Sequence, residues 1–270
     1  DRLVCHACCA ESRRPGSCPT CTSPTLRFLG AGSERIESEL ARMLPEARVR
    51  RMDSDTMRRR EDYEETLEAF GRGDIDCLVG TQMIAKGLDF PRVTLVGIVH
   101  ADGALHLPDF RAAERTFQLI AQVAGRAGRG QLPGKIVVQT LFPEHPAIQL
   151  AARHDYRGFA AGEDALRAEL GYPPHAALVR VLFEHESEAR VTDSAEACAE
   201  ALAGLPPDYR VLGPAPAPIA LLRGRHRRHL LVKLPSGADH LAPLLARLQA
   251  FAASGPRARA TVDVDPVSVL

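Results

Sequence analysis

Short apolar runs alternate with amphipathic stretches along the first half of the chain. The runs have the length of β-strands, and they are Thr25–Leu29, Val49–Met52, Asp76–Val79, Val93–Val99 and Lys135–Thr140. Between them, apolar residues recur at helical spacing at Ile36, Leu40, Met43 and Leu44, and again at Tyr63, Leu67 and Phe70. This alternation predicts an α/β domain in which a parallel sheet carries helices on both faces.

The last part of the chain has a different order of elements. Strand-like segments are Ala176–Glu184, Arg210–Leu212, Arg228–Leu234 and Arg259–Val264, and helical ones are Val191–Leu202 and Gly237–Ala252. The order β-α-β-β-α-β predicts an α+β domain of the ferredoxin-like split type. Ahead of it, Pro143 and Pro146 mark the start of a helix that runs towards Leu170, and Gly171–Pro174 is the next break.

We therefore expect four parts: a cysteine-rich segment (1–28), an α/β domain (29–145), a helical linker (146–174) and an α+β domain (175–270). Basic and acidic residues both number 34, so bulk charge offers no argument for nucleic-acid binding. No apolar run approaches the ~20 residues of a membrane span, which makes the cytoplasm the default location. Because the first residue is Asp1 and not Met, we interpret the chain as a fragment without its N-terminal portion.

Two polar residues at element ends carry local expectations. Ser33 precedes a helical stripe, so it is expected to be the N-cap of that helix. Asp102 follows an apolar run, where a buried carboxylate needs a partner, and Arg111 or Arg115 is the expected one.

Four cysteines near the start form two C-x-x-C pairs, Cys5 with Cys8 and Cys18 with Cys21, separated by nine residues. Pairs of this kind bring thiolates within reach of a tetrahedral Zn²⁺, and so small a segment cannot build a core of its own. The spacing predicts zinc binding, with all four thiolates around one ion.

The stretch Gln118–Gly130, QLIAQVAGRAGRG, places Arg126 and Arg129 three residues apart, on one face of a helical turn. Two guanidinium groups so spaced can grip one anion, and an arginine on a transferring phosphoryl group contributes roughly 10³ to 10⁵ in rate. About forty residues upstream, Gly80–Pro91, GTQMIAKGLDFP, links two apolar runs, as a ligand-binding loop at the end of a parallel strand does.

GTQMIAKGLDF resembles motif V and QVAGRAGR resembles motif VI of superfamily 2 helicases. Together with DGALHLPDFRAAERTFQL (Asp102–Leu119) between them, the wording resembles the PriA family of primosomal replication-restart DNA helicases, and the resemblance covers nearly the whole chain. It implies that the α/β domain is the second RecA-like helicase lobe, followed by an α+β DNA-binding domain.

The resemblance implies roles for the motif residues. Arg126 and Arg129 are the expected catalytic residues, and the expected nucleotide-binding residues are Gly87, Asp89 and Gln122. DNA phosphates are expected to contact Thr81, Gln82 and Lys86. For the cysteines, the family has two zinc ions held by nested pairs, so that Cys5 and Cys8 would serve one ion and Cys18 and Cys21 the other. The pairing is therefore open between one shared ion and two.

A second candidate DNA contact is the cluster Arg223, Arg225, Arg227 and Arg228, which is expected on a hairpin loop. Concentrated charge without aromatic residues favours phosphate contacts over base stacking, hence salt-sensitive binding without sequence preference. The alternative is a solubilising turn.

The family resemblance implies an ATP-driven 3′ to 5′ DNA helicase that recognises stalled replication forks and initiates restart. ATP and Mg²⁺ would bind between this lobe and a first lobe; the chain contains no G-x-x-x-x-G-K-[ST], so it is expected not to hydrolyse ATP alone. Expected partners are forked and single-stranded DNA, single-stranded DNA-binding protein, other primosome proteins and the replicative helicase loader. A monomer without a membrane partner, cytoplasmic and associated with the nucleoid, is implied.

The competing interpretation is a non-hydrolysing loader or scaffold, which would bind forks through the basic cluster and dock partners through the zinc knuckles. An RNA helicase is a third possibility, and the wording of the motifs disfavours it.

Overall fold

The computed structural model describes residues 2–4, 11–13, 15–18, 21–24, 32–53, 55–57, 59–81, 92–125 and 133–269. The chain forms two compact units. The C-terminal unit comprises Asp1–Leu26, Leu107–Arg111 and Ala160–Leu270, and the central unit comprises Arg27–His106 and Ala112–Phe159. Among the described residues, no helix is long and apolar enough to cross a membrane.

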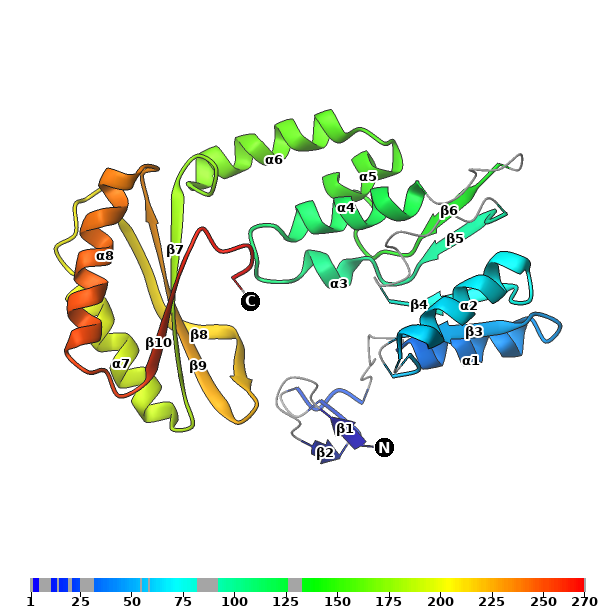
Figure 1. The fold of residues 1–270 in the computed structure, drawn as a ribbon, viewed down its shortest axis with the longest axis horizontal. Coiled ribbons are helices and arrows are strands. Elements are labelled where there is room, and N and C mark those ends of the chain that lie inside the picture. Colours follow the sequence, from blue (N-terminus) through cyan, green and yellow to red (C-terminus); the bar gives the residue numbers. More distant parts are fainter. Residues whose placement is uncertain are drawn as a thin grey trace. The chain divides into compact units, whose positions relative to one another are not determined.

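The central unit contains the predicted alternation of strands and helices (Figure 1). Its elements are α1 (Ser33–Met43), β3 (Val49–Met52), α2 (Arg60–Arg72), β4 (Cys77–Gly80), β5 (Leu95–Ile98), α3 (Asp102–Leu105), α4 (Ala112–Ala124), β6 (Lys135–Val138) and α5 (Pro146–Ala152). All the strand pairing in the described part of this unit is parallel, β3 with β4 and β5 with β6. Parallel strands confirm the α/β class; the described strands form two pairs, where one continuous sheet was expected. The strand expected at Thr25–Leu29 lies outside the described residues.

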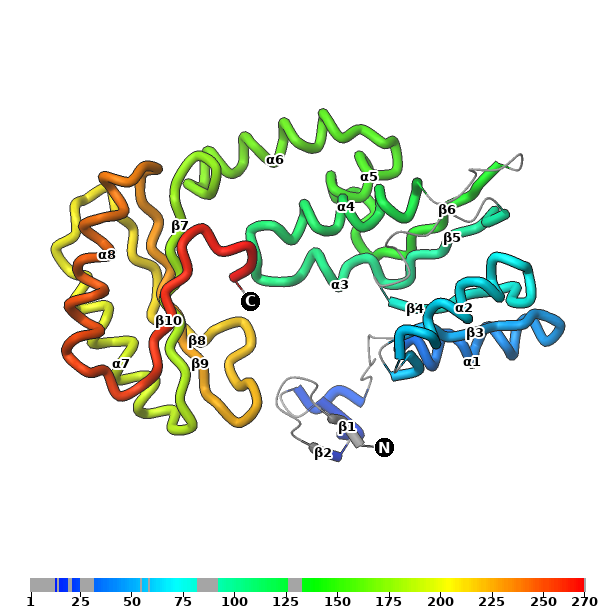
Figure 2. Tube along the Cα trace, in the orientation of Figure 1, coloured from blue at the N-terminus to red at the C-terminus, as the bar shows by residue number. Residues whose placement is uncertain are grey.

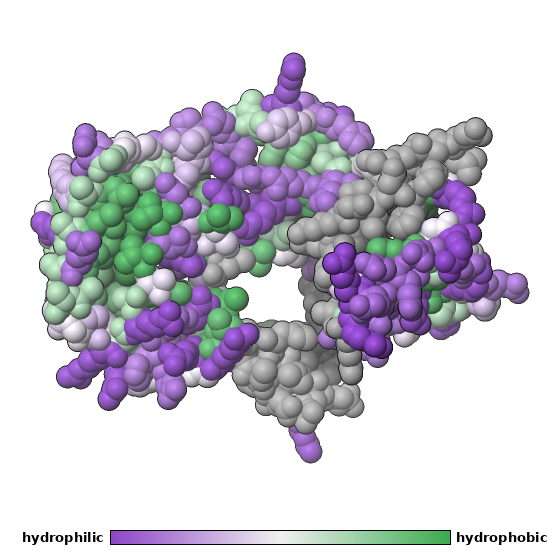
Figure 3. All heavy atoms as spheres, in the orientation of Figure 1, coloured by the Kyte–Doolittle hydropathy of each residue, from purple (hydrophilic) through white to green (hydrophobic). Residues whose placement is uncertain are grey.

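The start of α1 differs from the prediction. Gly32 is the N-cap and makes no side-chain capping bond, while Ser33 is the first helical residue. The Ser33 hydroxyl instead donates a hydrogen bond to the carboxylate of Asp53, which follows β3. A long-range acceptor has therefore taken the hydroxyl that local capping would have used. Hydrophilic residues cover α1 and α2 on the face seen in Figure 3, and no residue of α1 is fully buried.

The core of the central unit lies where α4 packs against α5 and the first turn of α6 (Tyr156–Leu170). Phe117 of α4 stacks on Phe159 with ring centroids 4.3 Å apart. The single helix expected from Pro146 to Leu170 is wrong, because the chain breaks between α5 and α6. At the break His154 adopts a left-handed φ of 55°, and the Asp155 carboxylate accepts a hydrogen bond from the Gly158 N–H at 2.8 Å, which caps α6.

The C-terminal unit confirms the predicted order β-α-β-β-α-β. Its elements are β7 (Ala177–His185), α7 (Glu188–Ala201), β8 (Arg210–Leu222), β9 (Arg225–Leu234), α8 (Ala238–Ala253) and β10 (Arg259–Val264). They form an antiparallel sheet in the order β10-β7-β9-β8, and α7 and α8 lie together on one side of it (Figure 1). Alternate strand residues face these helices and make the core, for example Val179, Val181 and Phe183, which are at most 1 % exposed.

Strand β8 is much longer than predicted. It continues from Arg210 through the sequence GPAPAPIALL to Leu222, with register shifts after Leu212 and after Pro216. Its prolines are tolerated because β8 is an edge strand with β9 as its one neighbour, so a missing N–H on its outer side breaks no ladder bond. Gly213 has φ +99°, and a Cβ there would lie 2.8 Å from the carbonyl oxygen of His229. The bend in this strand therefore requires glycine.

Candidate functional site

The carboxyl ends of β3 and β4 form the part of the predicted motor site that the structure describes best. Met52 pairs with Gly80, so Asp53 and Thr81 leave the same edge of this strand pair. Thr81 is exposed there, as a phosphate contact requires. The remaining predicted residues of this loop, Gln82, Lys86, Gly87 and Asp89, lie outside the described residues.

Asp53 is a buried carboxylate, 4 % exposed, at the start of the turn after β3. It accepts hydrogen bonds from the Ser33 hydroxyl and from the N–H groups of Asp55 and Thr56, both at 3.1 Å. The bond from Ser33 is the largest cause that lowers the pKa of Asp53, and the backbone bonds lower it further against the effect of burial. Asp53 is therefore an anion that ties the start of α1 to the edge from which Thr81 projects.

A second buried carboxylate, Asp102, has the same role after β5. It accepts hydrogen bonds from the Thr140 hydroxyl and, at 2.9 Å, from the Leu141 N–H. Burial raises its pKa, but these two bonds bring the pKa below its ordinary value. The expected partners, Arg111 and Arg115, were wrong: because β5 pairs in parallel with β6, the residues after β6 lie next to Asp102 and bond it first.

Helix α4 carries the first part of the arginine motif. Its buried face includes Thr116, Phe117 and Ile120. Gln122 lies in its last turn, and Gly125 follows the helix and donates its N–H to the Ala121 carbonyl at 3.1 Å. Arg126 and Arg129 lie outside the described residues. The structure thus shows a packed helix that ends two residues before the first of the two predicted catalytic arginines.

The four arginines of the basic cluster were expected on one hairpin loop, and the structure shows that they do not share one. Arg223 and Gly224 make the two-residue turn between β8 and β9, with φ values of 49° and 76°, while Arg225, Arg227 and Arg228 belong to β9. Positive φ at both turn positions is typical of a type I′ hairpin. The expectation of a loop is therefore wrong for three of the four residues.

Strand geometry sends these side chains in different directions. Arg223 and Arg225 are exposed at the hairpin tip. Arg227 is only 7 % exposed; its guanidinium lies 3.1 Å from the carboxylate of Glu184, opposite it on β7, and donates to the Ile219 carbonyl at 3.3 Å. Arg228 faces the helical side, where it donates to the Thr192 hydroxyl at 3.0 Å. Among the four, the tip residues are the ones free to meet a phosphate.

The sheet face away from the helices holds further basic residues that sequence reasoning missed. His229 and Lys233 follow Arg227 at even spacing along β9, and Arg180 lies on the neighbouring strand β7. Burial lowers the pKa of His229, and the positive charges of Arg180 and Arg227 lower it further, so both effects favour the neutral imidazole. The period of two in Arg225, Arg227 and His229 was the available signal for one strand face.

Cys18 and Cys21 lie at a tight turn that follows the small hairpin β1 (Arg2–Val4) and β2 (Glu11–Arg13). The Thr22 N–H donates to the Cys18 carbonyl at 2.8 Å, and the Cys18 N–H donates to the Ser23 carbonyl at 2.9 Å. Cys18 is partly buried, and Cys21 is exposed. The other predicted ligands, Cys5 and Cys8, lie outside the described residues, within which no three metal-binding side chains gather.

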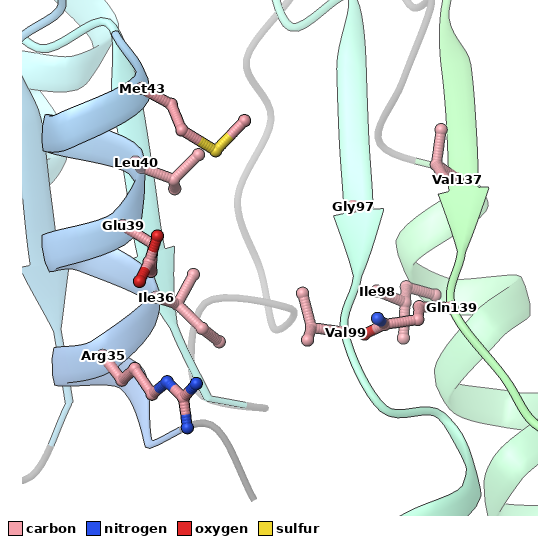
Figure 4. A pocket seen from close by; sticks show the side chains of 10 residues that line it. All are labelled: Arg35, Ile36, Glu39, Leu40, Met43, Gly97, Ile98, Val99, Val137 and Gln139. Carbon is pink, nitrogen blue, oxygen red and sulfur yellow. The ribbon is translucent and has the colours of Figure 1, made fainter. Parts of the chain in front are cut away.

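A cavity of about 530 Å³ lies between α1 and the ends of β5 and β6 (Figure 4). Ile36 and Leu40 face Val99 and Val137 across it. Its lining, as far as the structure describes this region, includes none of the residues predicted to bind nucleotide or DNA.

Two family models match this chain. The family described as Helicase conserved C-terminal domain matches residues 18–131, and the one described as Primosomal protein N C-terminal domain matches residues 168–267. The chain is 50% identical over 233 residues to the replication restart protein PriA of Bacillus subtilis (strain 168), covering 86% of this chain and 29% of that protein. It is 43% identical over 271 residues to PriA of Synechocystis sp. (99% and 32%) and 42% identical over 273 residues to PriA of Treponema pallidum (99% and 41%). The chain thus spans between 29% and 41% of the length of these relatives.

Proposed function

This chain belongs to the family of the replication restart protein PriA, and from that premise we propose that it supplies the second motor lobe and the DNA-binding C-terminal domain of an ATP-dependent 3′ to 5′ DNA helicase. The helicase would recognise stalled replication forks and start primosome assembly. The observation that carries this proposal is the match of residues 18–131 to a helicase C-terminal domain, which contains both the Thr81 loop and the arginine motif.

In the proposed motor, ATP and Mg²⁺ bind between this lobe and a first lobe that carries the phosphate loop. Arg126 and Arg129 would stabilise negative charge on the transferring phosphoryl group, with Gln122, Gly87 and Asp89 around the nucleotide. The packed helix α4 supports this role because it ends two residues before Arg126 and so fixes the point from which the motif starts. This chain alone is proposed to be inactive in ATP hydrolysis.

DNA would contact both units. Thr81, with Gln82 and Lys86, would bind backbone phosphates at the motor lobe, while Arg223 and Arg225 at the hairpin tip would bind them at the C-terminal domain. The antiparallel order β10-β7-β9-β8 supports a ferredoxin-like topology for this domain. Arg227 and Arg228 are proposed to support the hairpin from within, because both already have partners in the domain.

Zn²⁺ is the proposed structural ion of the N-terminal segment. The turn that holds Cys18 and Cys21 is closed by backbone hydrogen bonds, and the C-x-x-C spacing of these two thiols is typical of ligands of a tetrahedral zinc site. Cys5 and Cys8 would supply another pair. Zinc would hold together a segment that is too small to form a core, and this segment would serve as a docking site for other primosome proteins.

The test is ATP hydrolysis by the full-length protein containing this chain, with and without forked DNA. Arg126→Ala and Arg129→Ala should each lower DNA-stimulated turnover by roughly 10³-fold or more. Arg72→Ala is the matched control, because Arg72 is an exposed arginine that pairs with Asp74 on the surface of α2. A protein that binds forks yet hydrolyses nothing would refute the motor and favour a non-hydrolysing loader, which would use the same DNA contacts.

A further inference from the structure

The segment Leu107–Arg111, of sequence LPDFR, lies between two stretches of the central unit in sequence but belongs to the C-terminal unit in space. The chain leaves α3 through this segment and enters α4 directly after it, a path that Figure 2 shows as a continuous trace. The segment is thus a covalent crossing from one unit to the other and back.

Asp109 anchors the segment inside the C-terminal unit. Its side chain is 8 % exposed, and one carboxylate oxygen accepts hydrogen bonds from the Ser268 hydroxyl at 2.9 Å and the Val269 N–H at 3.3 Å. The other oxygen accepts from the Arg111 N–H at 2.9 Å. A buried carboxylate satisfied by three donors holds its segment in one conformation, because releasing it would leave charge and donors unpaired.

The C-terminal residues that hydrogen-bond Asp109 belong to a segment that is itself bound to the sheet. The Asp265 carboxylate accepts from the Leu178 N–H of β7 at 2.9 Å, and the Asp265 N–H donates to the Leu178 carbonyl at 2.7 Å. Arg111 adds a hydrogen bond from its guanidinium to the Val267 carbonyl at 3.2 Å. The anchor is therefore continuous with the sheet that ends in the Arg223–Arg225 hairpin.

Phe110 forms the second half of the anchor. Its ring stacks on Tyr172 at 4.9 Å between centroids, with 7° between the planes. The guanidinium of Arg167 lies 5.2 Å from the Phe110 ring centroid, and the Lys233 ammonium of β9 lies 3.4 Å from that of Tyr172. This stack connects the segment directly to β9, the strand that carries the basic hairpin.

We infer that Asp109 and Phe110 are positioning residues that couple DNA binding at the C-terminal unit to the arginine motif. Helix α4 begins one residue after Arg111, is packed along its buried face, and ends two residues before Arg126. A rigid helix passes a displacement of its first turn on to its last. This inference rests on the proposed motor function for the task it gives Arg126 and Arg129.

The experiment compares Asp109→Ala and Ser268→Ala with the unchanged full-length protein. Ser268→Ala removes one donor and keeps the acceptor, so it disturbs the anchor less than Asp109→Ala does. Ser254→Ala is the control. In the described part of the chain, the Ser254 hydroxyl donates one hydrogen bond, to the Phe251 carbonyl at the end of α8. The first readout is hydrogen exchange in residues 112–124 with and without forked DNA, and the second is ATP turnover.

Forked DNA should slow exchange in α4 several-fold in the unchanged protein and in the control. In both anchor variants that response should fall below twofold, while fork affinity and DNA-free turnover stay within about threefold and DNA-stimulated turnover drops at least tenfold. An α4 response that persists in the variants, or is missing from the unchanged protein, overturns the inference. Loss of fork binding together with the α4 response would overturn it too, since that indicates a purely structural role.

The experiments distinguish a failure of the proposed motor function from a failure of the proposed coupling. A full-length protein without ATP hydrolysis would refute the motor, while the exchange data would still decide the coupling. Normal hydrolysis with an unchanged α4 response in the anchor variants would refute the coupling alone.

Discussion

Replacing Arg227 by alanine should destabilise the C-terminal unit and leave the DNA-binding tip intact. The substitution leaves the carboxylate of Glu184 without its ion-pair partner and removes the packing of the aliphatic part of the Arg227 side chain. Breaking a fully buried ion pair costs about 3–5 kcal/mol, whereas an exposed pair contributes less than about 1 kcal/mol. The side chain of Glu184 is 21% exposed and that of Arg227 is 7% exposed, so the pair lies between these limits. We expect a loss of about 2 kcal/mol.

Hydrogen exchange measured by mass spectrometry is the assay, because it reports the two units separately. A loss of about 2 kcal/mol corresponds to roughly 30-fold faster exchange in the amides of β7 and β9 that open with the sheet. Arg225→Ala is the matched control, since it truncates an exposed arginine two residues away on the same strand, and its effect should stay within about 0.5 kcal/mol.

A double-mutant cycle separates the ion pair from other effects. Glu184→Ala alone should also destabilise β7 and β9, and the double variant should lose less than the sum of the single ones, because neither charge is then left without its partner. The reasoning is refuted when Arg227→Ala exchanges like the unchanged protein and weakens fork binding as much as Arg225→Ala does. Arg227 would then be a DNA contact, as the cluster in the sequence suggested.

Three further outcomes are expected. Ser33→Ala should lower stability at pH 7, and the difference should shrink as the pH is lowered. The pKa of Asp53 is lowered in the folded state, so its stabilisation is present above the unfolded pKa and is lost as pH falls through the folded pKa; melting temperatures of both proteins over a series of acidic pH values check this. Gly213→Ala should cost about 2 kcal/mol or more in urea unfolding, because of the positive φ and the clash with the His229 carbonyl. Arg225→Ala should reduce the slope of log affinity for DNA against log salt by about 1, and an unchanged slope in titrations at several salt concentrations would contradict a phosphate contact.

Much of the architecture could be predicted from local pattern. The period-two and period-3.6 repeats identified most of the described strands and helices, and the β-α-β-β-α-β order of the last domain followed from them. The failures have local causes as well. Strand β8 was cut short because prolines were interpreted as its end, and the break before α6 was missed because Asp155 was not recognised as a cap.

For the candidate site, the sequence identified the residues but not which of them are exposed. The residue types of the Thr81 loop and the arginine motif predict phosphate contacts, and the sequences of these two motifs indicate the family to which the chain belongs. Which arginine of the basic cluster is exposed could not be predicted from composition. It depends on where the turn begins, since moving the turn by one residue sends every side chain of β9 to the other face.

The sequence by itself determined the family and the element order, because these depend on residues close together along the chain. The tertiary structure alone decided the partners of the buried charges. Ser33 bonds Asp53 and not its own helix, Asp102 bonds Thr140 and not an arginine, and Asp109 bonds Ser268 from 159 positions away. A buried carboxylate takes whichever donors the fold brings to it, and parallel strand pairing and chain crossings bring together donors that no local spacing reveals.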